Sequence, residues 1–310
     1  MNLYWLQCGA CGGDSMSLLN ISSPDLTELA REIGLNLLWH PSLSNHSVGE
    51  HEQILDDLLA GKLPLDILCV EGFVISGPDG KGGYDLLGER PKLDIVRQLA
   101  VRAQVVIAAG TCASFGGVGN IGDVAASGLQ FSGEEPGGVL GADYRSGSGL
   151  PVVNLPGCPT HSGVLADTLM GISDGQLPDL NHQQAPRQWF DMLVHQGCLR
   201  NEYHEFRVEE REFGERGCLF FYRGCRGPLT SGPCNKLLWN RRSSKTNVGV
   251  PCVGCTDPNF PQQHPFFQTP NIADVPLELP AGVDRAHYLA YKGMAAAAAP
   301  DRLKKRKNLV

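Results

Sequence analysis

Cysteine dominates the chemistry available to this 310-residue chain, which contains eleven of them. The first residues show no basic segment, long apolar core or twin arginine, so we expect no export signal, a cytoplasmic protein and reduced thiols. Thiolates are soft ligands that suit zinc, copper and iron-sulfur clusters. The cysteines therefore predict metal or redox chemistry rather than a framework of disulfides.

Candidate metal ligands are dense between residues 195 and 255, in a segment rich in Gly, Pro and basic residues. The seven candidates are one histidine and six cysteines: His195, Cys198, Cys218, Cys225, Cys234, Cys252 and Cys255. Seven ligands suit a four-iron cluster held by three Cys and one His, together with a three-iron cluster held by three Cys. The alternative is two zinc sites with one ligand missing, because tetrahedral zinc needs four ligands.

The first 180 residues show the pattern of a parallel sheet covered by helices. Apolar runs at 3–7, 35–40, 65–72, 104–110 and 151–157 alternate with amphipathic segments at 23–34, 49–62, 90–103 and 160–172. This alternation predicts an α/β fold, a flavodoxin-like doubly wound parallel sheet. Ligands of such sheets gather beyond the carboxyl ends of the strands.

Three cysteines and one acid occupy such strand ends. Cys11 follows the first predicted strand, Glu71 ends the third, Cys112 follows the fourth and Cys158 follows the fifth. We therefore expect these four side chains to converge on one edge of the sheet, where Glu71 is a candidate for orienting work or proton handling.

The organisation predicted for the chain has three parts. Residues 1–180 form the flavodoxin-like domain, and residues 181–270 form a smaller loop-rich iron-sulfur domain that needs cross-links to be stable. Residues 271–310 form an extended tail that wraps around the protein or docks on it. The tail ends in RLKKRKNLV, which is read as a solvated end and alternatively as a site for peripheral binding at an anionic membrane surface or to a partner. The formal net charge of −7 and the lack of a basic stripe argue against nucleic acid as a partner.

The sequence contains an ordered set of motifs: CxxD, VEG, GTCAxxGG, LPGCP, HxxC, CLFFYRGCRGP, GPC and PCVGCTDPNFP. With this set, the chain resembles the small subunit of nickel-iron hydrogenases from about residue 3 to residue 262. The missing export signal, the six residues between Cys218 and Cys225, and LLWNRRSSKT after Cys234 are most similar to the cytoplasmic uptake and hydrogen-sensing subgroup.

The resemblance implies three iron-sulfur clusters that serve a large subunit with a nickel-iron centre. The distal cluster, with four irons or three, falls on His195, Cys198, Cys218 and Cys225. The medial three-iron cluster falls on Cys234, Cys252 and Cys255. The proximal cluster, near the partner's active site, lies in the first domain, where Glu71 would handle protons.

The proximal ligands depart from the family pattern. Family members carry a CxxC whose first Cys lies six residues after a tryptophan; counting from Trp5 gives Cys11, and the second family cysteine then falls on Asp14. The implied proximal set is therefore Cys11, Cys112 and Cys158, with Asp14 as an oxygen ligand of a four-iron cluster. A three-iron cluster without the fourth ligand, and Cys8 as a ligand after a loop shift, remain the alternatives.

As an activity, the resemblance implies H2 oxidation by the partner, with electrons leaving through this chain to an external acceptor such as a quinone pool or a carrier protein. It also implies an oligomer of heterodimers. Three rival functions stay open: the small subunit of a regulatory hydrogen sensor, a complex I-like quinone-reductase subunit, and a binding module that is stabilised by zinc and has no redox role. The quinone-reductase subunits usually contain adjacent cysteines, and none are adjacent here.

Overall fold

The computed structural model describes residues 1–121, 124–261 and 265–304. The chain divides into two compact units: Met1–Trp189 with Thr256–Gln262, and Phe190–Cys255 with Gln263–Val310. The division thus falls after Trp189 rather than after residue 180, and a short segment after Cys255 returns to the first unit.

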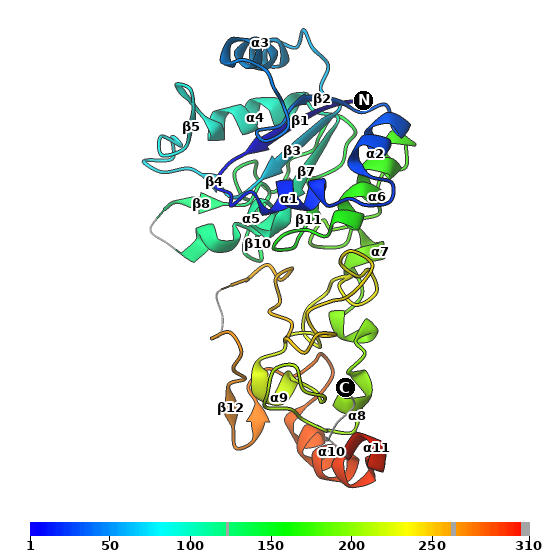
Figure 1. The fold of residues 1–310 in the computed structure, drawn as a ribbon. Helices are drawn as coiled ribbons and strands as arrows, with labels where there is room; N and C mark the ends of the chain where they lie inside the picture. The colour runs from blue at the N-terminus through cyan, green and yellow to red at the C-terminus, as the bar shows by residue number, and fades with distance from the viewer. Residues whose placement is uncertain (122–123, 262–264, 305–310) are drawn as a thin grey trace. The chain divides into compact units, whose positions relative to one another are not determined.

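A five-stranded parallel sheet forms the centre of the first unit (Figure 1). Its strands are β1 (Asn2–Gln7), β2 (Asn36–Trp39), β3 (Ile67–Glu71), β7 (Val105–Ala109) and β11 (Val153–Leu155), in the order β11-β7-β3-β1-β2. This is the order of a flavodoxin-like doubly wound sheet, so the predicted fold class is confirmed. The five strands coincide with the five apolar runs of the sequence; β1 begins one residue before its run, and the other four strands are a little shorter than theirs.

Three of the predicted helices connect strands of the sheet, and the fourth, α6 (Ser162–Ser173), follows the last strand, β11. The first three are α2 (Leu26–Glu32), α3 (Val48–Leu59) and α4 (Lys92–Arg102). Capping boxes start α2 at Asp25 and α3 at Ser47, which satisfies amide groups that a helix N-terminus leaves without partners. Figure 1 shows α3 and α4 on one side of the sheet and α2 and α6 on the other.

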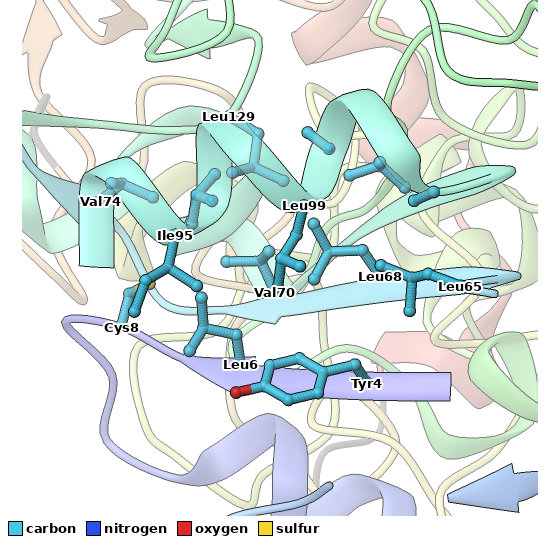
Figure 2. Close-up of a cluster of buried hydrophobic side chains, with 14 of the residues drawn as sticks. Tyr4, Leu6, Cys8, Leu65, Leu68, Val70, Val74, Ile95, Leu99 and Leu129 are labelled. Atoms are coloured by element: carbon cyan, nitrogen blue, oxygen red, sulfur yellow. The ribbon is translucent and has the colours of Figure 1, made fainter. Parts of the chain in front are cut away.

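The hydrophobic core between the sheet and α4 explains why the strands are buried. Side chains from β1 and β3 meet Ile95 and Leu99 of α4, as Figure 2 shows for Leu6, Leu68 and Val70. Each such side chain is at most 2% exposed. Burying a Leu or Ile side chain contributes about 1.5–3 kcal/mol, so this layer fixes the sheet on which the strand ends are arranged.

Short elements complete the first unit. Two helices, α1 (Gly13–Leu19) and α5 (Gly110–Phe115), and the 3-10 helix η1 (Gly117–Ile121) lie at the ends of strands, and the apolar pattern of the sequence did not predict them. Three small antiparallel pairs join β4 (Val74–Ile75) with β8 (Ala126–Ser127), β5 (Leu86–Leu87) with β6 (Arg90–Pro91), and β9 (Phe131–Ser132) with β10 (Glu135–Pro136).

The second unit consists mainly of turns and short helices. Its elements are η2 (Val194–Gly197), α8 (Asn201–Glu205), α9 (Phe220–Arg223), β12 (Asn271–Ile272), β13 (Val275–Pro276), α10 (Arg285–Ala298) and α11 (Asp301–Lys304), while α7 (Arg187–Phe190) spans the division between the units. This agrees with the loop-rich character expected from its composition.

Residues 271–304 are not an extended tail, which corrects that prediction. They form a β-hairpin and the 14-residue helix α10, whose N-cap Asp284 accepts a hydrogen bond from His287 N at 2.9 Å. Val275 and Tyr288 pack into a small core with Phe221, so this segment contributes apolar surface that the turns before it lack. Residues 305–310, which hold most of the predicted basic end, lie outside the described residues.

Within the described ranges, the longest apolar helix is too short to cross a bilayer.

Candidate iron-sulfur sites

The first candidate site lies at the carboxyl edge of the sheet. Cys11 is exposed between β1 and α1, Cys112 lies in α5 after β7, and the exposed Cys158 follows β11. Burial raises the pKa of the Cys112 thiol, the amide of Val118 lowers it, and the charges of Asp14 and Cys11 raise it again. The three cysteines therefore lie beyond the ends of β1, β7 and β11, and the charges of Cys11 and Asp14 are close enough to act on Cys112.

Hydrogen bonds join the loops that carry these cysteines. Thr111 N donates to Gly157 O at 2.8 Å, and Gly157 N donates to Thr111 Oγ1 at 2.9 Å, which ties the turn before Cys112 to the turn before Cys158. Ser17 of α1 donates to Thr160 O at 2.6 Å. Helix α1 and both cysteine turns thus form one hydrogen-bonded group.

The backbone approaches two of the sulfurs closely, at Gly13 and at Gly117. A Cβ added at Gly117 would lie 2.8 Å from Cys112 Sγ, and one added at Gly13 would lie 3.2 Å from Cys11 Sγ. Real Cβ atoms rarely approach sulfur so closely, so only glycine fits at Gly117, where φ is +50°. Glycine thus lets the backbone pass close to Cys11 Sγ and Cys112 Sγ, as a backbone that surrounds an iron-sulfur cluster must do.

Glu71 is completely buried at the end of β3 and organises the start of α1. Its carboxylate accepts hydrogen bonds from Asp14 N at 3.0 Å and from Ser15 through N at 3.2 Å and Oγ at 2.5 Å. Trp5 Nε1 at 3.0 Å and Gln7 Nε2 at 3.4 Å donate as well. The structure therefore gives this carboxylate an orienting task, because five donors converge on it.

Asp14, which takes the place of the family's second cysteine, lies in the first turn of α1 and is 8% exposed. Its Oδ1 accepts a hydrogen bond from Thr160 N at 2.8 Å, and its carboxyl group contacts Gly110. Burial raises its pKa to about 7, although the Thr160 amide lowers it, and the charge of Glu71 raises it further. A buried carboxyl of this kind gains from a cation, since desolvation penalises its charge.

Cys8 lies apart from this site. It is 6% exposed in the hydrophobic core with Leu6 and Ile95, as Figure 2 shows, and its amide donates to Glu71 O at 2.8 Å. Burial raises the pKa of its thiol to about 12, the value of an inert structural cysteine. The visible CxxC of the sequence is therefore divided between the core and the sheet edge.

A cavity in the second unit brings together the four predicted distal ligands. His195, Cys198, Cys218 and Cys225 all line it. Burial raises the pKa of Cys218, and the charges of Glu209, Cys225 and Cys198 add to this effect. The seven candidates of the sequence thus separate in space, and these four share one enclosure.

Backbone amides around the cavity point toward the sulfurs. Arg200 N donates to Cys198 Sγ and Phe220 N donates to Cys218 Sγ, both at 3.4 Å. The Arg200 guanidinium holds the surrounding loops by donating to three carbonyls, Thr246 O at 2.7 Å, Glu215 O at 2.5 Å and Gly217 O at 2.7 Å. Amide donors to thiolates suit an iron-sulfur cluster, whose potential depends on such hydrogen bonds.

The remaining cysteines of the second unit interact with one another. Burial and the charge of Cys255 together raise the pKa of Cys234 to about 12. Burial also raises the pKa of Cys252, as do the charges of Cys225, Cys255 and Cys234, while Gly254 N donates to Cys252 Sγ at 3.4 Å. The predicted medial set therefore comes together and adjoins the distal set, with Arg226 N donating to Cys252 O at 2.8 Å.

Across the described parts of the chain, no three His, Cys, Asp or Glu side chains meet as the ligands of one metal ion do.

One residue beside the distal cavity was not predicted from the sequence. His204 is 8% exposed in α8, and its ring packs edge-on against that of His195 with 4.5 Å between centroids. Burial, together with the charges of His195 and Arg207, lowers its pKa to about 3. The segment NEYHEF offers only a second histidine near a helix as a signal, and that is too common to single out.

Comparisons with known proteins match both units. Residues 190–268 match the family that describes the C-terminal part of the NiFe/NiFeSe hydrogenase small subunit, and residues 11–172 match NADH ubiquinone oxidoreductase, 20 Kd subunit. The F420 non-reducing hydrogenase II small subunit of Methanosarcina mazei is 31% identical over 84% of this chain and 73% of its own length. The quinone-reactive Ni/Fe-hydrogenase small chain of Wolinella succinogenes is 26% identical over 83% and 71%.

A solved structure agrees over the whole chain. The actinobacterial-type NiFe-hydrogenase of Ralstonia eutropha superposes with a TM-score of 0.79 at 25% identity, covering 100% of this chain and 93% of that one.

Fold and ligand groups together define an iron-sulfur protein that works in electron transfer. The match at 190–268 separates it from quinone-reductase subunits, which share the family of the first unit. The chain belongs to the nickel-iron hydrogenase small-subunit family. It is accordingly the electron-transfer part of a hydrogenase and pairs with a large subunit.

Proposed function

We propose that this chain carries electrons from H2 oxidised in its large subunit through three iron-sulfur clusters to an external acceptor. The observation that carries this proposal is the enclosure of His195, Cys198, Cys218 and Cys225 in one cavity that adjoins a second cysteine group at Cys252. Adjoining ligand groups suit a relay, because an electron passes between them over a short distance.

Each group of side chains has a task in this proposal. Cys234, Cys252 and Cys255 would hold a medial three-iron cluster, and the cavity ligands would hold a distal cluster of four irons or three. When bound, the clusters supply one-electron carriers. Amides directed at Cys198, Cys218 and Cys252 stabilise negative charge on the sulfurs.

At the sheet edge, Cys11, Cys112 and Cys158 would hold the proximal cluster, with Asp14 as its fourth ligand. This proposal is supported by the burial of the Asp14 carboxyl and by the contact of its backbone with Glu71, which fixes the first turn of α1. A carboxylate is a harder and less electron-donating ligand than a thiolate, so we infer that it raises the proximal potential and favours H2 oxidation.

The acceptor in this proposal is a quinone pool or a carrier protein. Its support is the name of the Wolinella relative, which is quinone-reactive. Assembly into an oligomer of heterodimers, a cytoplasmic location and binding of the complex to the inner face of the membrane stay predictions, which gel filtration and cell fractionation test.

The proposal is tested on the complex of this chain with its large subunit, purified without oxygen. We expect about ten to eleven irons with matching sulfide in each small subunit, and three distinct cluster signals in EPR spectra of oxidised and reduced samples. Zinc without sulfide would refute the relay. Rapid H2 oxidation with an artificial acceptor supports uptake, whereas slow turnover with all clusters present would assign a sensor instead.

Protein-film voltammetry tests the proximal ligand. Asp14→Cys is expected to lower the proximal potential and shift the catalytic bias toward proton reduction, with Asp174→Cys, a change in an exposed turn, as the control. Unchanged potentials and bias in Asp14→Cys would remove Asp14 from the ligand set.

A further inference from the structure

We propose that His204 is a positioning residue of the distal site, and that it donates a hydrogen bond from Nδ1 to the Cys218 thiolate and thereby raises the reduction potential of the cluster bound there. The inference rests on the proposed function, because it assumes a distal cluster. It assigns a role to a buried side chain that takes no part in binding iron.

The first observation is the place of His204 relative to the cavity. His204 Nδ1 lies 3.4 Å from Cys218 Sγ, and its ring packs edge-on against His195. The side chains that line the cavity include His195 and Cys218, and His204 lies behind these two. His204 therefore contacts two ligands from outside the enclosure, the position from which a residue orients ligands and adjusts their charge.

Arg207 determines which ring nitrogen of His204 carries the proton. Its Nη1 lies 3.3 Å from His204 Nε2, and a guanidinium can only donate hydrogen bonds. Nε2 must then accept, so the proton of the neutral ring sits on Nδ1, where Cys218 Sγ is the neighbouring acceptor. The direction of donation thus runs from Arg207 to His204 to the thiolate.

Cys218 consequently receives two donors, one from the backbone and one from a side chain. Phe220 N donates to its Sγ at 3.4 Å, the same distance as from His204 Nδ1. Reduction adds one electron to the cluster and no proton, so the reduced state is more negative and gains more from each donor. Loss of a donor therefore lowers the midpoint potential.

The ring is also held in place by apolar packing. Phe220 contacts it edge-on at 5.5 Å between centroids, and Arg207 lies 4.7 Å above the ring of Tyr288 in α10. Helix α10 therefore supports the donor chain through Arg207.

The test is a redox titration of the complex with its large subunit, followed by EPR. His204→Phe keeps an aromatic ring without donors, and we expect it to lower the distal midpoint potential while the other two cluster potentials stay in place. His204→Asn is the matched control, because its amide nitrogen can occupy the position of Nδ1, and it should retain most of the wild-type potential. In ENDOR spectra, an exchangeable proton coupled to the distal cluster should vanish in His204→Phe and persist in His204→Asn.

The outcomes separate this inference from the proposed function. A wild-type complex without a distal cluster signal refutes the relay itself. With that signal present, an unchanged potential in His204→Phe, or an equal fall in His204→Asn, overturns the role of His204. If His204→Phe does not assemble the cluster, Arg207→Met serves as the test. Without Arg207 the proton is no longer confined to Nδ1 of His204, so the distal midpoint potential should fall by less than the full effect of losing the donor. An unchanged distal potential in Arg207→Met would overturn the inference.

Discussion

The two units of this small subunit hold their cysteines by different means. In the first, β1, β7 and β11 are fixed by a buried core, and the candidate ligands Cys11, Cys112 and Cys158 lie beyond the strand ends, in turns and in the short helix α5. In the second, Cys218 and Cys225 are themselves members of the small apolar core, beside Phe220 and Phe221. The first unit therefore folds and then presents ligands, whereas the second depends on its ligands for part of its fold.

Removal of the clusters should expose this difference most strongly. After anaerobic treatment of the complex with a chelator and an oxidant, we expect amide exchange in residues 190–255 to approach that of an unprotected chain, because metal binding and folding are coupled in small domains. Amides of β3 and β7 should stay protected. Hydrogen-exchange mass spectrometry measures both, and equal loss in the two units would contradict the comparison.

The difference between the units also explains what the sequence could predict. Strands and long helices of the first unit follow from apolar periodicity, and strand ends then locate Cys11, Cys112 and Cys158. Helix α1 is too short for a periodic signal and depends on the Glu71 carboxylate. The start of α1 therefore cannot be predicted without the position of the Glu71 carboxylate at the end of strand β3.

The second unit shows the same limit more clearly. Its ligands could be grouped by number and by family resemblance, but the contacts among them arise from turns that have no periodic pattern. His204 has a role only through Cys218 and Arg207, which tertiary packing brings to its two ring nitrogens. Helix α10 begins at Arg285, after its N-cap Asp284, in a segment for which the sequence predicted a tail.

Glu71→Gln probes how firmly the first unit presents its site. The side-chain NH2 of the introduced Gln would face groups that are themselves hydrogen-bond donors. We therefore expect the free energy of opening of the backbone amides in α1 and β1 to fall by about 3 kcal/mol. Native-state hydrogen exchange measures this loss. Glu89→Gln, at an exposed turn, serves as the control and should be neutral; a neutral Glu71→Gln would show that the carboxylate is not the organising group.

Arg200→Met is the matching test in the second unit. The Arg200 guanidinium donates hydrogen bonds to three carbonyls around the distal cavity. Loss of these hydrogen bonds should lower the free energy of local opening of residues 198–217 by about 2 kcal/mol. The free energy of opening in Arg200→Lys should lie between those of the wild type and of Arg200→Met, since one ammonium group cannot reach all three carbonyls. As a second readout, the distal EPR signal of Arg200→Met should decay faster in air than that of the wild type. Unchanged hydrogen exchange in Arg200→Met would mean that the cluster alone, without Arg200, stabilises these loops.

The smallest effect concerns His51, far along the chain from every proposed ligand. Its ring stacks on Trp39 at 3.7 Å between centroids, and its Nε2 pairs with Tyr4 Oη at 2.8 Å. Burial lowers the pKa of His51 from its usual value near 6.5, Glu52 opposes this shift, and His46 adds to it. The folded unit therefore prefers the neutral ring.

The sign of the pH dependence follows from that preference. Because the unfolded chain takes up the proton first, the contribution of His51 to stability is complete above about pH 6.5 and is lost as the pH falls through the lower pKa of the folded state. Between about pH 7.5 and 5.5, the opening free energy of α3 should fall more in the wild type than in His51→Gln. Equal slopes would mean that the sheet tolerates a charge beside β1, and that the first unit is less rigid than its buried core implies.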